Sequence, residues 1–310
     1  MQRLTRFRYA AGLLVMAAWI ASGPSVGAQD QDVIFDERLP AGLLEAWKRA
    51  PELVGSPTLA WTDRELITVA FNGGDDQIRR LIEKTSGELL DPMVGVRFSF
   101  RTPDGRWRPW SRNDRLAAAA IRIDFSMREE DGGYWSALGR MALVARPNEQ
   151  TMNLGDLLLK LPQYKDGTSA DWSNSYAKST ILHEFGHALG LSHEHFHPHC
   201  QADLKIDEAV TYFQGPPNKW SESQAKFNID ASYYFEATKI RSDAAFPKRK
   251  HDPVISASID RKSLMMYRLK DKYYKSGAGS PCKPLAAVGY ATAPSDGDRA
   301  AIRSFYPKRP

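Results

Sequence analysis

Apolar and polar residues begin to alternate regularly at Glu65, and the pattern from there predicts a half of the chain built from strands and helices. Residues 65–71 (ELITVAF) have the apolar, β-branched character of a strand. After the turn sequence NGGDD, residues 77–90 repeat apolar side chains at helical spacing, and VGVRFSF at 94–100 reads as a second strand. A strand, a helix and a strand in this order predict a crossover unit with parallel pairing.

Further strands and one helix are expected downstream. The strands cover AAAAIRIDF (117–125), RMALVA (140–145) and QTMNLG (150–155). Ser173 or Asn174 is expected to cap a helix that continues through YAKSTILHEFGHALG. This half of the chain therefore has a sheet and two long helices.

The second half has little regular pattern until its end. Residues 191–290 are rich in turn residues and aromatics, and they predict no topology. In APSDGDRAAIRSFYP, Ser295 is followed three residues later by Asp298, an arrangement that caps a helix. Ile302 and Phe305 are then available to dock this final helix.

The first 28 residues are a separate segment. Three arginines precede an apolar run of about a dozen residues, and small residues precede Ala28, which together predict a secretory signal peptide (1–28). The run is shorter than the roughly 20 residues that span a bilayer, so we expect no stable membrane insertion once it is removed. Residues 29–57, with a short helix expected at 43–50, form an N-terminal extension or a short propeptide.

Charge and cysteine content narrow the choice of partners and compartment. Without the signal peptide the chain keeps 39 basic and 37 acidic side chains, a net charge of +2, and we expect no nucleic-acid partner. The basic run PKRKH (247–251) is interpreted as a surface loop. Cys200 and Cys282 are an even pair in an exported protein, which favours a disulfide over two free thiols. We expect a secreted or periplasmic protein.

The candidate chemistry lies in HEFGHALGLSHEHFHPHC (183–200), which holds six of the seven histidines. On a helix, His183 and His187 lie four residues apart on one face and can bind the same ion. Glu184 is turned by about 100° from that face. Beside the ion, it can take a proton from a metal-bound water.

Gly190 decides how the remaining histidines are interpreted. A glycine at this point can adopt the left-handed conformation that ends a helix, so that the chain turns back and presents His193. Three neutral imidazoles with no cysteine ligand leave a fourth position open, as in catalytic rather than structural zinc sites. We therefore expect one catalytic Zn²⁺ ion. The three histidines beyond the turn are expected to lie around the zinc ion without binding it: His195, His197 and His199. The alternative is that they form a second, weaker metal site.

The string H-E-x-x-H-x-x-G-x-x-H is the zinc signature of the metzincin metallopeptidases, and the chain resembles their astacin branch. In that branch Glu and His follow the third histidine, as Glu194 and His195 do here. YWSALGR (134–140) resembles the W-S-x-x-G segment of the family, and DRKSLMMY (260–267) resembles its D-x-x-S-x-M-x-Y turn, with Met266 where a histidine is usual.

The resemblance assigns roles to residues outside the histidine string. It implies that Met265 packs beneath the three histidines as the Met-turn and that Tyr267 reaches the zinc as a fifth, displaceable ligand. Tyr267 would then stabilise the oxyanion that forms during attack on the substrate. It also implies that Glu194 pairs with the mature N-terminus after a propeptide is removed.

Pattern and resemblance together imply an α+β, metzincin-like fold for residues 58–310. We expect a mixed, mostly parallel twisted sheet with an antiparallel edge strand and two long helices in an upper subdomain (58–190). The lower subdomain (191–310) is expected to be irregular and to end in a helix.

The function implied is that of a secreted zinc metalloendopeptidase acting on a protein or peptide substrate. Zinc-bound water activated by Glu184 would attack the peptide bond, with the substrate extended along residues 140–145 as an added strand. A zinc-dependent amide or ester hydrolase that is not a peptidase and a non-catalytic metal-binding module remain as alternatives. We expect a monomer.

Overall fold

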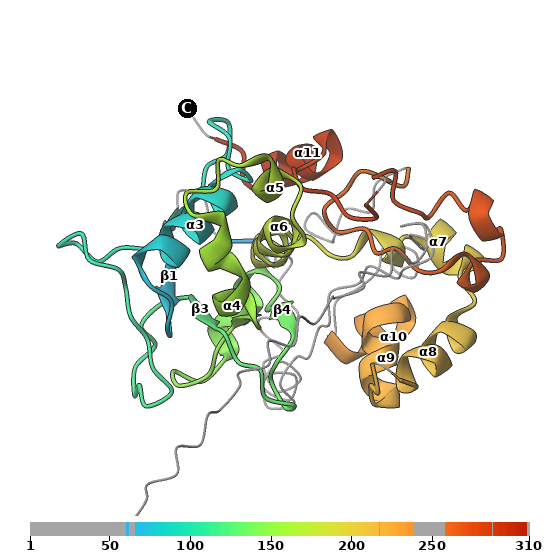
Figure 1. Cartoon of the computed structure of the whole chain (residues 1–310), viewed down its shortest axis with the longest axis horizontal. Coiled ribbons are helices and arrows are strands. Elements are labelled where there is room, and N and C mark those ends of the chain that lie inside the picture. The colour runs from blue at the N-terminus through green and yellow to red at the C-terminus, as the bar shows by residue number, and fades with distance from the viewer. Residues whose placement is uncertain (1–59, 62–65, 217, 239–257, 287, 309–310) are drawn as a thin grey trace, which may run out of the picture.

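The computed structural model describes residues 60–61, 66–216, 218–238, 258–286 and 288–308 (Figure 1). The expected signal peptide (1–28), the extension at 29–57 with its helix, and the basic run at 247–251 lie outside these ranges. In the described part of the chain, no helix has both the length and the hydropathy needed to cross a membrane.

A five-stranded sheet with the order β2-β1-β3-β5-β4 forms the first half of the molecule. Strand β1 (Leu66–Phe71) pairs in parallel with β2 (Arg97–Ser99) and with β3 (Ile121–Asp124). Strand β5 (Met152–Leu154) continues the parallel pairing, and β4 (Tyr134–Ser136) closes the edge in the antiparallel direction. The prediction of a mostly parallel sheet with an antiparallel edge strand is confirmed.

Helix α3 (Asp76–Gly87) makes the predicted crossover from β1 to β2. The Asp75 side chain caps it by accepting a hydrogen bond from the backbone nitrogen of Ile78 at 2.9 Å. Its apolar face, which includes Ile78, Leu81 and Ile82, is buried in the main core. The amphipathic period of the sequence therefore identified both the helix and the side that packs.

The segment expected to form a strand at 140–145 is instead a 3-10 helix, η2 (Gly139–Val144), so this prediction was wrong. Met141, Ala142 and Ala145 are buried while Leu143 is 44% exposed. That is helical spacing rather than the alternation of a strand. The short apolar run was compatible with both, and the edge of the sheet is β4.

Helix α6 (Tyr176–Ala188) is the second long helix and lies at the centre of the view in Figure 1. Its cap is Ser175, whose hydroxyl accepts from the nitrogen of Lys178 at 3.0 Å, rather than Ser173 or Asn174. Ser173 instead ends a separate short helix, α5 (Ala170–Ser173). Before α5 come the short helix α4 and the 3-10 turn η3: Leu157–Lys160 and Leu161–Tyr164.

The second half is more helical than the sequence pattern indicated. Its short helices are α7 (Pro198–Asp203), α8 (Ile206–Gln214), α9 (Glu222–Ile229) and α10 (Ala231–Thr238). Helices α7, α8 and α9 contribute to a second apolar cluster, apart from the core around the sheet. Three 3-10 turns complete the described part of this half: η4 (Glu194–Phe196), η5 (Asp271–Tyr273) and η6 (Gly277–Gly279).

The final helix, α11 (Asp296–Phe305), forms as predicted. Ser295 and Asp298 make a reciprocal capping box, and Ile302 is buried in the main core. Figure 1 shows α6 between the sheet on one side and helices α7 to α10 on the other, with α11 close to α6. The histidine string therefore lies where the two halves of the chain meet.

Candidate metal centre

His183 and His187 project from α6, and each ring is fixed by a main-chain carbonyl. His183 Nδ1 lies 2.8 Å from the oxygen of Leu264, and His187 Nδ1 lies 2.7 Å from the oxygen of Leu191. A carbonyl oxygen only accepts hydrogen bonds, so each Nδ1 carries the proton and each Nε2 keeps its lone pair. Both rings thus have the tautomer that a metal requires.

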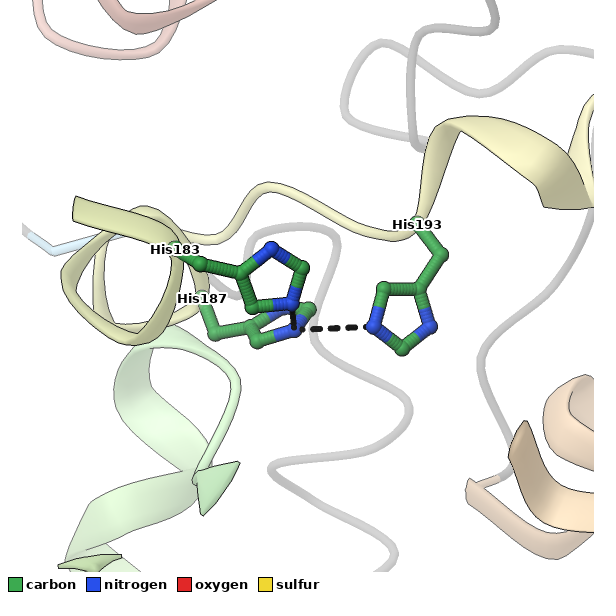
Figure 2. Close-up of side chains that lie close together, drawn as sticks. All are labelled: His183, His187 and His193. Carbon is green, nitrogen blue, oxygen red and sulfur yellow. Dashed lines mark hydrogen bonds between the residues drawn. The ribbon is translucent and has the colours of Figure 1, made fainter. Parts of the chain in front are cut away.

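His193 brings a third nitrogen to the same point (Figure 2). Gly190 has φ +93°, so it takes the left-handed conformation that lets the chain leave α6 and return. The Nε2 atom of His187 lies 3.1 Å from that of His183 and 3.2 Å from that of His193. In the described residues these three histidines are the only group of three or more potential ligands with such close donor atoms.

These distances fit a zinc ion. Bonds of about 2.0–2.1 Å in a tetrahedral arrangement place neighbouring ligand nitrogens about 3.3 Å apart. The Nε2 lone pairs of His183 and His187 would repel one another at 3.1 Å without a cation between them. All three imidazoles are nearly or completely buried, so the set is that of a metal site in a protein interior.

Met265 packs against the helix between the two histidines. A Cβ atom placed on Gly186 would lie only 2.8 Å from Met265 Sδ, so the sulfur occupies the space above this glycine. Met265 belongs to the main core, whereas Met266 belongs to the apolar cluster of the lower half. The structure therefore places Met265, and not its neighbour, against Gly186, directly before His187.

Asp298 of α11 supports the turn that carries Met265, which we call the Met-turn (residues 260–267). Its carboxylate accepts hydrogen bonds from Ser263 Oγ at 2.7 Å and from the nitrogen of Leu264 at 2.9 Å. Burial raises the pKa of Asp298, although these hydrogen bonds oppose the rise. Because the oxygen of Leu264 faces His183, the final helix is linked to a candidate ligand through a single residue, Leu264.

Glu194 lies beside the third histidine and binds the start of the Met-turn. Its Oε1 accepts from the nitrogen of Asp260 at 2.7 Å, and its own nitrogen donates to the oxygen of Met265 at 2.9 Å. Burial raises the pKa of Glu194 to about 7, and the carboxylates of Asp260 and Asp298 add to the rise while the bond from Asp260 N opposes it. Glu194 is thus a buried acid close to two other acids.

Glu184 and Tyr267, the residues with expected catalytic roles, are both fully buried. Glu184 directly follows His183 on α6. The ring of Tyr267 lies against the ligand set, with its centroid 4.4 Å from that of His193 and 5.9 Å from that of His183. Its hydroxyl is 3.5 Å from Oδ1 of Asn228, a residue that belongs to no motif of the sequence.

The last three histidines of the string have different surroundings. His195 is buried, stacks on Tyr267 and contacts the oxygen of Asn228 through Nε2 at 2.9 Å. His197 Nδ1 accepts from the nitrogen of His199 at 3.2 Å and so caps α7. In the part of the chain that the structure describes, these histidines form no second group of three potential ligands.

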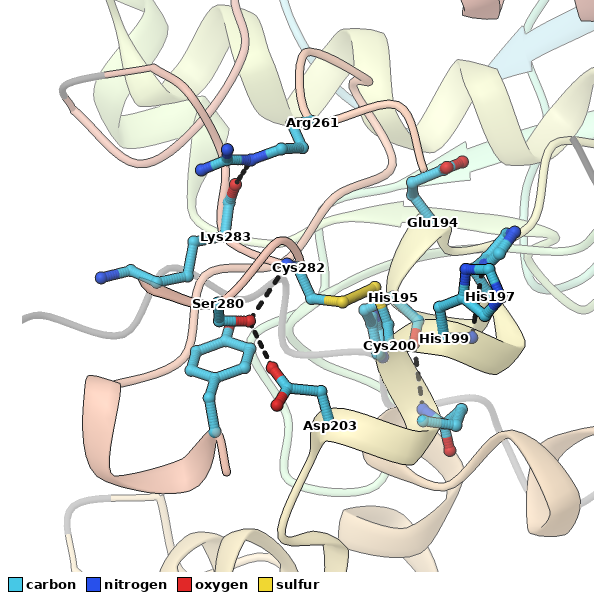
Figure 3. Close-up of a disulfide and its surroundings, with 12 residues drawn as sticks. Glu194, His195, His197, His199, Cys200, Asp203, Arg261, Ser280, Cys282 and Lys283 are labelled. Atoms are coloured by element: carbon cyan, nitrogen blue, oxygen red, sulfur yellow. Dashed lines mark hydrogen bonds between the residues drawn. A yellow bond between two sulfur atoms is a disulfide. The ribbon is translucent and has the colours of Figure 1, made fainter. Parts of the chain in front are cut away.

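A disulfide joins Cys200 on α7 to Cys282 in the C-terminal segment (Figure 3). Both cysteines are fully buried in the lower apolar cluster. Asp203 strengthens the same junction by accepting from Ser276 Oγ at 2.7 Å and Ser280 Oγ at 2.6 Å. The segment that follows the third histidine is therefore fixed covalently and by hydrogen bonds to the chain beyond the Met-turn.

Comparison with known proteins finds a likeness in structure alone. No family model matches the chain, and no curated protein matches its sequence. A structure of myroilysin has 25% sequence identity and a TM-score of 0.56, with 81% of this chain and 97% of that chain covered. A crystal structure of myroilysin matches with 25% identity, 80% and 86% coverage and a TM-score of 0.48.

The hatching enzyme zinc-protease high choriolytic enzyme 1 of the medaka fish Oryzias latipes matches with 17% identity, 80% and 94% coverage and a TM-score of 0.42. The likeness to the first myroilysin structure extends over 81% of this chain. It supports the α+β, metzincin-like fold that the sequence motifs implied.

Proposed function

Because the chain has the fold of an astacin-like metallopeptidase, we propose that it is a zinc-dependent endopeptidase that acts on proteins or peptides. The observation that carries the proposal is the convergence of three buried Nε2 atoms, from His183, His187 and His193, at distances suited to zinc. Among the described residues this group contains no cysteine, and three histidines without a cysteine ligand are typical of catalytic rather than structural zinc.

The three histidines would hold the ion and leave a coordination position for water or substrate. When bound, zinc lowers the pKa of a coordinated water to about 7 and polarises a substrate carbonyl. The carboxylate of Glu184 accepts a proton from the attacking water as the bond between the water oxygen and the carbonyl carbon forms. It then gives the proton to the amide nitrogen as the carbon–nitrogen bond breaks.

Tyr267 is proposed to assist at the carbonyl oxygen. Its hydroxyl would donate a hydrogen bond to this oxygen as negative charge develops there. The ring already lies against His193, so a small movement of the side chain would suffice.

The substrate is proposed to extend along β4 rather than along residues 140–145. Strand β4 is the last strand of the sheet, paired with β5 on one side. Its other side can offer main-chain donors and acceptors to an extended peptide. Binding through main-chain groups suits an endopeptidase, since every peptide presents them.

The proposed organisation comprises a signal peptide (1–28), an extension or propeptide (29–57) and one catalytic domain (58–310). The domain would consist of an upper subdomain (58–190) and a lower subdomain (191–310) with the metal site between them. The Cys200–Cys282 disulfide is consistent with export to an oxidising compartment. We propose that the exported protein is a monomer.

The test is to purify the protein with Glu184→Ala beside it, measure zinc in both, and map cleavage sites in a peptide mixture. We expect about one zinc in each, and cleavage by the unaltered protein that a chelator stops and added zinc restores. The rate of peptide cleavage by the variant should fall by at least the factor of about 10²–10⁴ that general base catalysis typically supplies. Full cleavage by the variant would refute the mechanism. Hydrolysis of small esters or amides without peptide cleavage would favour the non-peptidase alternative.

A further inference from the structure

His195 and Asn228 meet beside Tyr267, although they lie on different elements of the lower half. His195 belongs to η4 and Asn228 to α9, and both side chains are buried. His195 Nε2 is 2.9 Å from the main-chain oxygen of Asn228, which can only accept, so this nitrogen carries a proton and donates it. The contact fixes the plane of the imidazole ring.

The imidazole of His195 packs against the ring of Tyr267. The rings of His195 and Tyr267 are stacked, with centroids 4.6 Å apart and planes inclined by 20°. The Tyr267 ring also contacts His193, whose centroid is 4.4 Å away. His195 also stacks on His193, with centroids 5.0 Å apart, so the three rings pack against one another.

The side chain of Asn228 is oriented toward the tyrosine hydroxyl. Its Nδ2 donates to the oxygen of Gln224 at 2.9 Å, and this partner decides which end of the amide is nitrogen. Oδ1 is then the end that lies 3.5 Å from Tyr267 Oη. That separation is at the long limit of a hydrogen bond, so the contact guides the hydroxyl without binding it tightly.

Gln201 connects the end of α9 to the segment that follows the third histidine. Gln201 Nε2 donates to the oxygens of His195 at 3.0 Å and Ile229 at 3.1 Å, and its Oε1 accepts from the nitrogen of Ala231 at 3.0 Å. These bonds hold the junction of α9 and α10 against the segment that follows the third histidine. The position of Asn228 is thus set relative to the metal centre.

We propose that Asn228 and His195 are positioning residues that hold Tyr267 ready to donate to the carbonyl oxygen of the substrate. The inference rests on the proposed peptidase function and adds two residues to its machinery. Stacking on His195 sets the plane of the Tyr267 ring. Asn228 Oδ1 orients the Tyr267 hydroxyl until the substrate oxygen replaces Oδ1 as the acceptor. A donor oriented in advance costs no reorganisation when charge develops.

The kinetic test is a double-mutant cycle between Asn228→Leu and Tyr267→Phe, with peptide cleavage as the assay. Tyr267→Phe should lower kcat by about 10²–10³-fold, as the loss of an oxyanion donor does. Asn228→Leu keeps the branched shape of the side chain but removes its acceptor and its donor. It should lower kcat by about tenfold or more, as misplacement of a reacting group does, with KM and zinc content unchanged. The double variant should be no slower than Tyr267→Phe alone.

Asp203→Ala is the control. It removes the acceptor of the hydrogen bonds from Ser276 and Ser280 elsewhere in the lower half, and these bonds involve neither the tyrosine nor its proposed positioning residues. We expect a lower thermal midpoint with kcat unchanged. If the losses of Asn228→Leu and Tyr267→Phe multiply, or if Asp203→Ala lowers kcat as much, Asn228 acts through general stability and the proposal is wrong.

A second readout needs no activity. Protein labelled with 3-fluorotyrosine should give a fluorine resonance for residue 267, assigned by its absence in Tyr267→Phe. Asn228→Leu and His195→Ala should each shift this resonance, and Asp203→Ala should not. An unchanged resonance in both variants overturns the positioning role. Absence of peptide cleavage by the unaltered protein would instead refute the proposed function, and the fluorine spectra would then decide the positioning role alone.

Discussion

Replacing Glu194 by glutamine should make the metal-free protein more stable at pH 8 and have little effect at pH 4. Burial raises the pKa of Glu194 from 4.5 to about 7 in the folded protein. The folded state therefore binds this proton more tightly than the unfolded chain does. The stability that the protonated form contributes is fully present below pH 4.5 and is lost as the pH rises through about 7.

The magnitude follows from the two pKa values. A shift from 4.5 to about 7 corresponds to roughly 3 kcal/mol at a pH above both values. Glutamine keeps an oxygen that can accept from the nitrogen of Asp260 but carries no charge at any of these pH values. At pH 8 the variant should exceed the unaltered protein in free energy of unfolding by up to that amount.

The assay is urea unfolding of both proteins from pH 4 to 8, with a chelator present so that zinc binding does not add its own pH dependence. Only the difference between the two curves is interpreted, because every other ionisable group contributes to both. Glu130→Gln, at a carboxylate whose side chain is 66% exposed, is the control and should stay within about 0.5 kcal/mol throughout. Parallel curves for Glu194→Gln and the unaltered protein, or a difference that grows toward low pH, would refute the reasoning.

Three further variants test the packing and the supports around the metal centre. Gly186→Ala should lower the free energy of unfolding by about 1–3 kcal/mol and weaken zinc binding, because its Cβ would meet the Met265 sulfur at 2.8 Å. Thermal melts measure the loss of stability. In these melts the control Gly87→Ala, with open space around its Cβ, should be neutral or stabilising. Asp298→Ala should cost about 2–4 kcal/mol, since buried donors of the Met-turn lose a charged acceptor, and chelator competition should show weaker zinc binding. Replacing Cys200 and Cys282 by serine should lower stability by about 2–4 kcal/mol in denaturant titrations, because the bridge closes a loop with a sequence separation of 82; an unchanged midpoint would contradict this.

Local rules acting over a few residues account for what the sequence alone determined. The crossover from β1 through α3 to β2 follows from hydrophobic periodicity, and the capping box of α11 from the spacing of Ser295 and Asp298. The convergence of three histidines was likewise inferred from one helix and one glycine. In each case the partners are close in sequence, so helix geometry and backbone conformation fix their separation.

Tertiary structure decided whatever depends on contacts between distant segments. The run at 140–145 could be a strand or a helix until the core buried Met141 and Ala142 together. The short helices of the lower half gain their stability from packing, so their sequences carry weak signals. His195 acquires its place only because Asn228, 33 residues away, offers it a carbonyl oxygen and Tyr267 stacks on it. Spacing along a helix predicts which side chains share a face, but only the folded chain determines what that face meets.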